Sequence, residues 1–530
     1  MDQMLLITRY NQIKQQAMPK NKPFEKNPIA LKLFLQLKDD FKEFLTSKDG
    51  EYLAIQSILA HIYHDIGCLY VNNGDITMAE SYFKECLELF KTHDIQTKAR
   101  SAYMGALFNI GAITDDRKKA LYYLTDAEKA YKEHKESQEG ANHKGITQED
   151  RLYKEIMEQL AEVYNDLGIV NMTVKYNYMA MKWSFENKLY ISCDLSAQSA
   201  DIAFFYITRR NFKEARRYMA AANYFAEEFR NESNDGHHVE KVFADLGRQW
   251  AHYGLSLLTV SRKRLDGEEH ELFSGMKHIA LDNEMPFLFP KLPLAKYEKI
   301  TADYCTTLND AKEVFLFIKK WLEKSKEFYK PNVELKTFVN VTTDFAKLYN
   351  LMSSFEDQWH NQYDMQKMSF KYFDDFFGQL GPKTPIGIWR DVWYGTGQSY
   401  CLLIQLEGRM IDENVDTSFI NRSESDQMAK RAILYFQLLI NSFRGESSYW
   451  KPNTTFEEKK MCIDAHNKLA LLYSIHADPD IPESITDAYT YLKEFIWHCN
   501  KDKEMKIAFK QDIDVAQKRI ESINKVFFGR

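Results

Sequence analysis

Histidine pairs are the first residues in this sequence whose type and spacing could do chemistry. His61 and His64 are three residues apart, so on a helix they would share one face and could ligate a metal ion together. No motif around them supplies a third ligand at the spacing of a known zinc site. His237 and His238 lie in a polar stretch and are expected to be solvated. We therefore predict neither a metal site nor a cofactor.

Signatures of catalysis are missing as well. Gly395-Thr-Gly397 is a short glycine pair between helical stretches, and it favours a loop or helix-packing role. A Gly-x-x-x-x-Gly-Lys-Ser/Thr phosphate loop, a Gly-x-Ser-x-Gly nucleophile elbow and a His-Glu-x-x-His metal helix do not occur. The sequence therefore indicates a binding protein rather than an enzyme, and we expect no small-molecule substrate.

Composition limits the class of partner. The 530 residues carry a formal net charge of −6, which does not favour wholesale nucleic-acid binding. No apolar run reaches the ~18 residues that span a bilayer, so we expect no membrane insertion. A signal peptide begins with a basic segment that is followed by an apolar core. The N-terminus lacks this arrangement, so we expect no signal peptide. Seven scattered cysteines without a Cys-x-x-Cys motif favour reduced thiols and a cytoplasmic location.

Two stretches of the chain repeat one another with a period of 42 residues. The first reads LAEVYNDLGIV from Leu160, and the second reads IAFFYITRRNF from Ile202. A large residue, then an alanine, then Tyr164 or Tyr206 three positions later, lie on one helical face. The alanine lets two helices approach closely, and the tyrosine fills the groove beside them. This pattern is typical of the helix-turn-helix unit of tetratricopeptide (TPR) repeats, whose usual period is ~34 residues.

One such unit cannot bury its own apolar face, so neighbouring units must stack on it. Two further copies precede the central pair, at Tyr52–Phe90 and Thr97–His134. We therefore predict an all-α, TPR-like α-solenoid. The other expected helices are Met4–Met18, Leu31–Leu45, Asp310–Phe328, Phe338–Met352, Ser354–Phe377, Pro385–Leu406, Asp426–Phe443 and a closing amphipathic helix, Glu504–Asn524.

A long helix is expected over Val239–Arg264. Phe243, Leu246, Trp250, Tyr253 and Leu257 follow spacings of 3 and 4, which form a seam for burial against other helices. Its place between two sets of helix pairs suggests a bridging helix. The predicted organisation is an N-terminal TPR-like half, 1–235, the bridging helix, 236–264, and a C-terminal TPR-like half, 265–530.

The candidate binding residues lie on the first helix of each central unit, because first helices line the inner surface of a stacked solenoid. Positions not used for packing would point into a groove that could capture a partner helix. Acidic residues there, Glu158, Glu162, Asp166 and Asp201, would favour a basic partner. Ordinary surface, or packing between repeats for Phe204 and Ile207, is the alternative. The candidates are Gln159, Glu162, Asn165, Asp201, Phe204 and Ile207.

Several stretches of the chain resemble the repeats of a known family. LAEVYNDLGIVNMTVKY and FFYITRRNFKEARRYMAAANYF resemble the repeats of the kinesin-binding proteins (KIF-binding protein, KBP). Weaker agreement follows in the same order along most of the chain, including GRQWAHYGLSLL and AKRAILYFQLLINSF. The resemblance implies a right-handed α-solenoid of two halves. It also implies family contact positions at Gln159, Glu162 and Asp201.

The resemblance further implies a function. Such a protein binds kinesin motor domains, covers their microtubule-binding helix and so regulates transport on the microtubule cytoskeleton. A generic TPR adaptor that docks a peptide or helix of another partner is the alternative. That class often uses Lys/Arg clamps for a carboxylate, whereas the candidate positions here are acidic or neutral.

Overall fold

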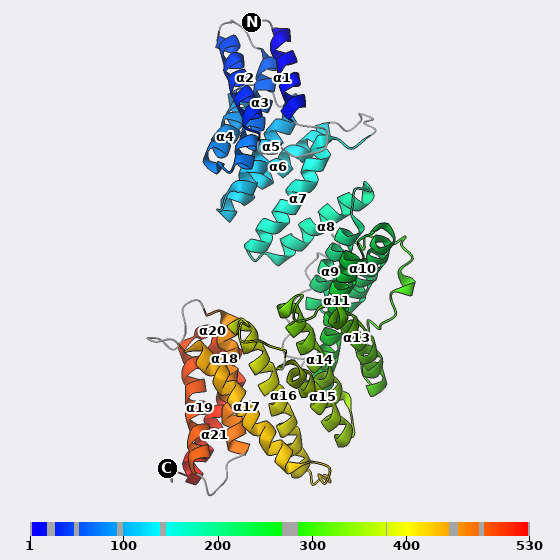
Figure 1. Ribbon diagram of the computed structural model, residues 1–530, viewed down its shortest axis with the longest axis vertical. Helices are drawn as coiled ribbons and strands as arrows, with labels where there is room; N and C mark the ends of the chain where they lie inside the picture. The colour runs from blue at the N-terminus through cyan, green and yellow to red at the C-terminus, as the bar shows by residue number, and fades with distance from the viewer. Residues whose placement is uncertain are drawn as a thin grey trace. The chain divides into compact units, whose positions relative to one another are not determined.

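The computed structural model describes residues 3–17, 27–46, 52–92, 99–137, 145–267, 285–377, 379–444, 454–475 and 482–527. These residues form α-helices and one 3₁₀ turn, and none of them is in a strand, so the all-α prediction is confirmed (Figure 1). No helix among them has a stretch that is both long and apolar enough to cross a bilayer. The chain forms two compact units, which divide at Gln198 and Ser199.

The first unit contains the described residues up to Gln198 together with residues 285–290. Its helices are α1 (Gln3–Ala17), α2 (Pro28–Thr46), α3 (Leu53–Asn73), α4 (Ile76–Thr92), α5 (Arg100–Ile113), α6 (Arg117–Ser137), α7 (Gln148–Asp166), α8 (Val170–Glu186) and the start of α9 (Ser192–Thr208).

The second unit contains the rest of the described chain. After the end of α9 come α10 (Phe212–Glu232), α11 (Gly236–Leu265), η2 (Leu294–Lys296), α13 (Leu308–Phe328), α14 (Leu335–Phe355), α15 (Trp359–Phe377), α16 (Ile386–Asp412), α17 (Arg422–Phe443), α18 (Phe456–Ile475), α19 (Pro482–Lys501), α20 (Lys503–Ala508) and α21 (Lys510–Phe527).

Helix pairs are the building block of both units, as the repeats predict. In the first unit α3 packs on α4, α5 on α6 and α7 on α8, and the first helices α3, α5 and α7 also touch in that order. In the second unit α11 pairs with α13, α14 with α15, α16 with α17 and α18 with α19. There α11, α14, α16 and α18 form a continuous layer of first helices. We call each set the first-helix layer of its unit.

The tyrosine of the repeat signature has a constant partner. In three pairs it stacks on a second tyrosine twelve residues later, on the following helix, with interplanar angles of 12° to 16°. The ring centroids lie 5.5 Å apart for Tyr70 and Tyr82, 5.5 Å for Tyr164 and Tyr176, and 5.7 Å for Tyr206 and Tyr218. The predicted groove-filling role of this tyrosine is thereby confirmed.

The small residue of the signature is needed for close helix contact. A Cβ added at Gly67 would lie 2.4 Å from the ring of Phe83 on the paired helix, and one at Gly111 would lie 2.7 Å from Leu124. Ala161 and Ala203 are buried at the matching positions. Because these positions sit where two helices touch, a larger side chain would push the pair apart.

The predicted long helix exists as α11, and all five residues of its seam are buried. It begins at Gly236, capped by the carboxylate of Asp235, three residues before the predicted start at Val239. Gly247 and Gly254 let α11 lie directly against α13. The helix thus takes the first-helix position of a pair. The division into 1–235, 236–264 and 265–530 stays a prediction.

Several helix boundaries differ from those expected, and two of these differences have a clear structural cause. The helix predicted over Ser354–Phe377 begins only at Trp359, because α14 continues to Phe355 and the buried Glu356 adopts an extended conformation after it. The predicted Glu504–Asn524 helix is two helices, α20 and α21, which join at Phe509. Phe509 is buried against Phe495, with ring centroids 5.7 Å apart, so the chain turns there to place it in the core.

Candidate partner-binding surface

Helix α7, which carries three of the candidate residues, is firmly held at its start. Thr147 and Asp150 form a reciprocal capping box, in which each side chain accepts from the other's backbone amide. The Asp150 carboxylate also accepts from Tyr131 Oη at 2.7 Å and pairs with Lys135 Nζ at 2.7 Å. Burial alone would raise the pKa of Asp150, but Lys135, Thr147 and Tyr131 together lower it to about 2.

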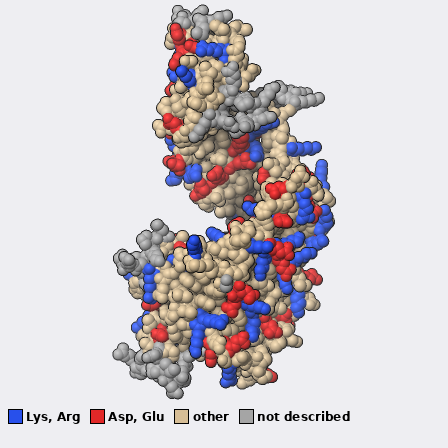
Figure 2. Space-filling model, viewed as in Figure 1, with Lys and Arg blue, Asp and Glu red and all other residues tan. Residues whose placement is uncertain are grey.

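The three candidates on α7 lie on its solvent side, in the first unit. Gln159 is half-buried, and Glu162 and Asn165 are exposed. The Gln159 amide donates to Glu162 Oε2 at 3.2 Å, which orients that carboxylate. Figure 2 shows acidic side chains gathered around α6 and α7 in this unit.

Two of the predicted acidic residues already have cationic partners. Glu158 pairs with Lys154 at 2.8 Å, and Asp166 pairs with Arg117 on α6 at 2.8 Å. Their charges are therefore compensated inside the first unit, and less of their field reaches a partner. Glu162 accepts a hydrogen bond from the neutral amide of Gln159, a contact that does not compensate its charge, and it is the acidic candidate on α7 that we retain.

The other candidates lie on α9 in the second unit. Asp201 is exposed, although surrounding protein atoms reduce its hydration and raise its pKa. Phe204 is 45% exposed, and its ring stacks on His252 of α11 with centroids 4.9 Å apart. Ile207 is only 4% exposed, so its predicted groove position is wrong. Ile207 lies about 60° further round the helix than Phe204, at the edge of the exposed face, and its side chain belongs to the core.

Basic residues beside the Phe204–His252 stack were missed by sequence reasoning. Asp344 and Lys347 of α14 follow in the same first-helix layer, and Arg248 lies one turn before His252 on α11. Burial raises the pKa of Asp344 to about 6, against the opposing effect of Lys347 and Arg248. Burial and Lys347 both lower the pKa of His252. Arg248 and His252 lie on the side of α11 opposite its apolar seam. That position on the helix is the sequence signal that could have identified them.

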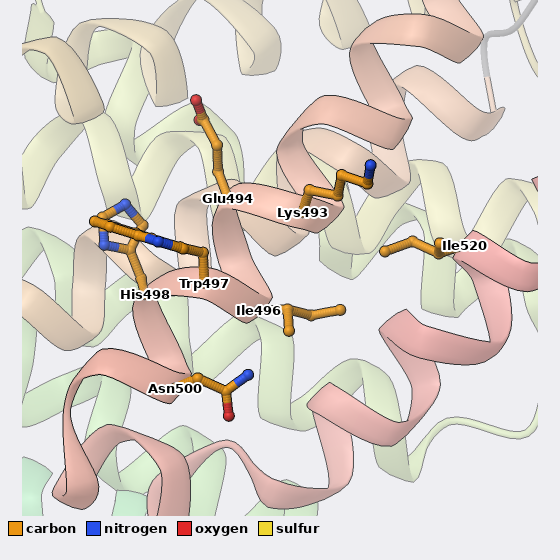
Figure 3. A pocket seen from close by; sticks show the side chains of 7 residues that line it. All are labelled: Lys493, Glu494, Ile496, Trp497, His498, Asn500 and Ile520. Carbon is orange, nitrogen blue, oxygen red and sulfur yellow. The ribbon is translucent and has the colours of Figure 1, made fainter.

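A separate groove of about 710 Å3 lies near the C-terminal end of the second unit (Figure 3). Trp497, which is 50% exposed, stands edge-on to the buried His498, with ring centroids 4.7 Å apart. The groove is open and mostly apolar, and no candidate residue lines it. Its lining residues are Lys493, Glu494, Ile496, Trp497, His498, Asn500 and Ile520.

Comparison with known proteins identifies the family. A family model described as "KIF-1 binding protein C terminal" matches residues 193–522, which is more than half of the chain. The chain belongs to the KIF-binding protein family. A tetratricopeptide repeat model matches residues 60–93, within the predicted repeat Tyr52–Phe90. The resemblance stated from the sequence is thereby confirmed.

Relatives in the KIF-binding protein family match along almost the whole chain. The KIF-binding protein of Drosophila melanogaster is 26% identical over 552 residues, covering 95% of this chain and 92% of the relative. That of Homo sapiens is 19% identical and covers 87% of this chain and 82% of the relative. A solved structure of "Kinesin binding protein (KBP)" covers 99% of this chain with a TM-score of 0.60 at 16% identity, which shows a shared fold.

Proposed function

We propose that this protein binds kinesin motor domains and keeps them from attaching to microtubules, and so acts on the microtubule cytoskeleton in the cytoplasm. The observation that carries the proposal is the match to the KIF-binding protein family along almost the whole chain. The relatives' names describe binding to kinesins, and binding rather than covalent chemistry is what we propose for this chain.

The charge on α7 and α9 supports this class of partner. A kinesin surface that docks on acidic tubulin must be basic, and basic surfaces are attracted to exposed carboxylates such as Glu162 and Asp201. Gln159 and Asn165 would add hydrogen bonds beside Glu162. Phe204, a half-exposed ring fixed by His252, has the character of an interface anchor, since rigid aromatic side chains dominate binding energies.

Pelleting of kinesin motor domains with microtubules tests the proposal. A panel of purified motor domains is mixed with microtubules and a non-hydrolysable nucleotide, with and without this protein in excess. We expect at least one motor to move from the pellet to the supernatant when the protein is present. Unchanged pelleting of every motor, together with no complex in solution, would refute both binding and inhibition.

One structural observation supports the TPR-adaptor alternative. Arg248 and Lys347 lie in the first-helix layer of the second unit, where paired cations could hold a carboxylate. The Asp344 carboxylate interacts electrostatically with both cations, so it offsets part of their attraction for a ligand carboxylate. A peptide ending in a free carboxylate should then bind better than its amidated form. Equal affinities for the two peptides would exclude a carboxylate clamp at Arg248 and Lys347.

A further inference from the structure

A cysteine, a histidine, a carboxylate and an amide meet in the first unit, away from the candidate partner-binding residues. Cys68 of α3 lies one turn after His64, with Sγ 3.7 Å from Nε2 and 4.0 Å from Nδ1 of the imidazole. Asn109 of α5 places its amide nitrogen 3.6 Å from Sγ and 3.2 Å from Nε2. Asp65 lies behind the ring, with Oδ1 3.5 Å from Nδ1.

The position of the imidazole is built into the fold. A Cβ added at Gly105 of α5 would lie 2.4 Å from His64 Nε2, so glycine makes the space that the ring occupies. The Phe83 ring lies 5.9 Å away on another side. Asp65 is 3% exposed, and Lys14 Nζ lies 3.2 Å from its carboxylate. Residues from three helices besides α3 thus surround the group.

These contacts are suited to making a thiolate. The Cys68 thiol can pass its proton to His64, Asp65 then stabilises the imidazolium at Nδ1, and the Asn109 amide donates toward the negative sulfur. Burial alone would lower the pKa of His64, but Cys68 and Asp65 outweigh burial and raise it. The other titratable groups nearby are Lys14, His61, the buried Cys86 and Tyr10, whose hydroxyl lies 3.4 Å from Asp65 Oδ2. Burial and Lys14 lower the pKa of His61 to about 4, which leaves it neutral.

The surroundings of the other cysteines differ. Cys86, Cys305, Cys401, Cys462 and Cys499 are buried. Cys193 of α9 is partly exposed like Cys68, but its Sγ lies 3.6 Å from the Asp194 carboxylate. Burial and the Asp194 charge both raise the pKa of Cys193. The protein therefore contains two accessible thiols, one beside a base and one beside an acid.

We propose that Cys68 is a site of oxidation by hydrogen peroxide. The thiolate sulfur attacks one peroxide oxygen, an S–O bond forms and the O–O bond breaks. The sulfur is oxidised by two electrons to a sulfenic acid, and the second oxygen leaves as hydroxide. His64 gives this hydroxide the proton it took from the thiol, so that water is released. A metal role is not favoured, since no group of three ligating side chains within the described residues could hold an ion.

Competitive alkylation measures the thiolate. The full-length protein is pulsed with iodoacetamide between about pH 6 and pH 9, and labelling at Cys68 and Cys193 is followed by mass spectrometry of peptides. We expect Cys68 to react at least about tenfold faster than Cys193 at neutral pH, because His64 can take the Cys68 proton whereas the Asp194 carboxylate disfavours a thiolate at Cys193. The Cys193 rate should rise about tenfold per pH unit over this range, because burial and the Asp194 charge raise the pKa of Cys193.

The His64→Gln variant then tests proton transfer from the thiol to His64, and peroxide treatment tests oxidation of the sulfur. His64→Gln should lower the Cys68 rate to near that of Cys193 and leave the Cys193 rate unchanged, which also reports that the fold is intact. Peroxide with a dione trap for sulfenic acid should label Cys68 before Cys193. Equal wild-type rates at the two thiols, or a trap adduct confined to Cys193, would overturn the proposal. The wild-type comparison decides the matter even if His64→Gln does not fold.

Discussion

Phe204 of α9 stacks on His252 of α11, with ring centroids 4.9 Å apart and an interplanar angle of 27°. Almost half of the Phe204 side chain still faces solvent. Burial keeps His252 neutral near pH 7 by lowering its pKa, so the stack is not charged. An apolar ring fixed by a neutral neighbour loses little entropy on binding, which suits an anchor for a partner.

Truncation of this ring should weaken partner binding without unfolding the protein. We expect Phe204→Ala to lower the affinity for a kinesin motor domain about tenfold, roughly 1.4 kcal/mol, as measured by titration calorimetry. Phe419→Ala is a matched control. Phe419 is a similarly exposed ring in the second unit, lying edge-on to His360 at 5.1 Å. Equal effects of the two substitutions would argue against a special role for Phe204.

Charge reversal tests the acidic candidates. Glu162→Lys with Asp201→Lys should weaken motor binding about tenfold or more at low salt, and the loss should shrink as ionic strength rises. Both changes are needed because one exposed ion pair contributes only ~0–1 kcal/mol. Glu133→Lys with Asp514→Lys changes the same charge at exposed positions elsewhere. Binding that survives the first double change would remove these residues from the interface.

Two glycine substitutions should have opposite effects on stability. Gly67→Ala places a methyl group 2.4 Å from the Phe83 ring, and we expect a loss of about 1–3 kcal/mol. Gly408 lies inside α16 with open space around it, so Gly408→Ala should stabilise by about 0.5–1 kcal/mol through helix propensity. Urea unfolding followed by circular dichroism distinguishes the signs. A neutral Gly67→Ala would contradict close packing within the repeat.

Asp344 should make stability depend on pH. Its pKa of about 6 in the folded protein exceeds its ordinary value, so the folded state binds a proton that the unfolded chain has lost. The contribution of Asp344 to the free energy of unfolding is therefore fully present below about pH 4, and it is lost as the pH rises through about 6. Asp344→Asn should gain stability relative to wild type across that range, by about 3 kcal/mol at most, and then keep a constant advantage.

The urea midpoints of both proteins, measured from about pH 4 to pH 8, check this expectation. Asp514→Asn serves as a control, because Asp514 is an exposed carboxylate in the same unit. Its midpoint should follow wild type at every pH. Parallel curves for Asp344→Asn and wild type would show that the Asp344 carboxylate is not desolvated.

Much of the fold could be predicted because the repeat signature is local. Gly67 and Tyr70 reveal a helix contact by size alone, and the contact with Phe83 and the stack on Tyr82 bear this out. The break at Phe509 could not be predicted, since an apolar residue there fits the periodicity of one continuous helix. Only the tertiary contact with Phe495 explains why the chain turns.

The candidate surface was less accessible to sequence reasoning. Ile207 shares the first helix with Phe204, and helical spacing alone did not separate an exposed position from a core position. The apolar seam of α11 predicts which side of the helix is buried, but it does not indicate which neighbours Arg248 and His252 meet on the other side. The pairing of α11 with α13 and its contact with α14 place the opposite side of the helix in the first-helix layer. The side of α11 that lies in the first-helix layer is set by the neighbouring helices and cannot be predicted from the sequence of α11 alone.

The most direct test of the account is the fraction of kinesin motor domain that pellets with microtubules as this protein is titrated in. The account predicts that, for at least one motor, the pelleted fraction falls toward zero as a soluble complex with this protein forms. It also predicts that Glu162→Lys with Asp201→Lys shifts the titration to higher concentration. A motor that binds this protein and still pellets in full would contradict inhibition, and a panel with no complex at all would contradict the account itself.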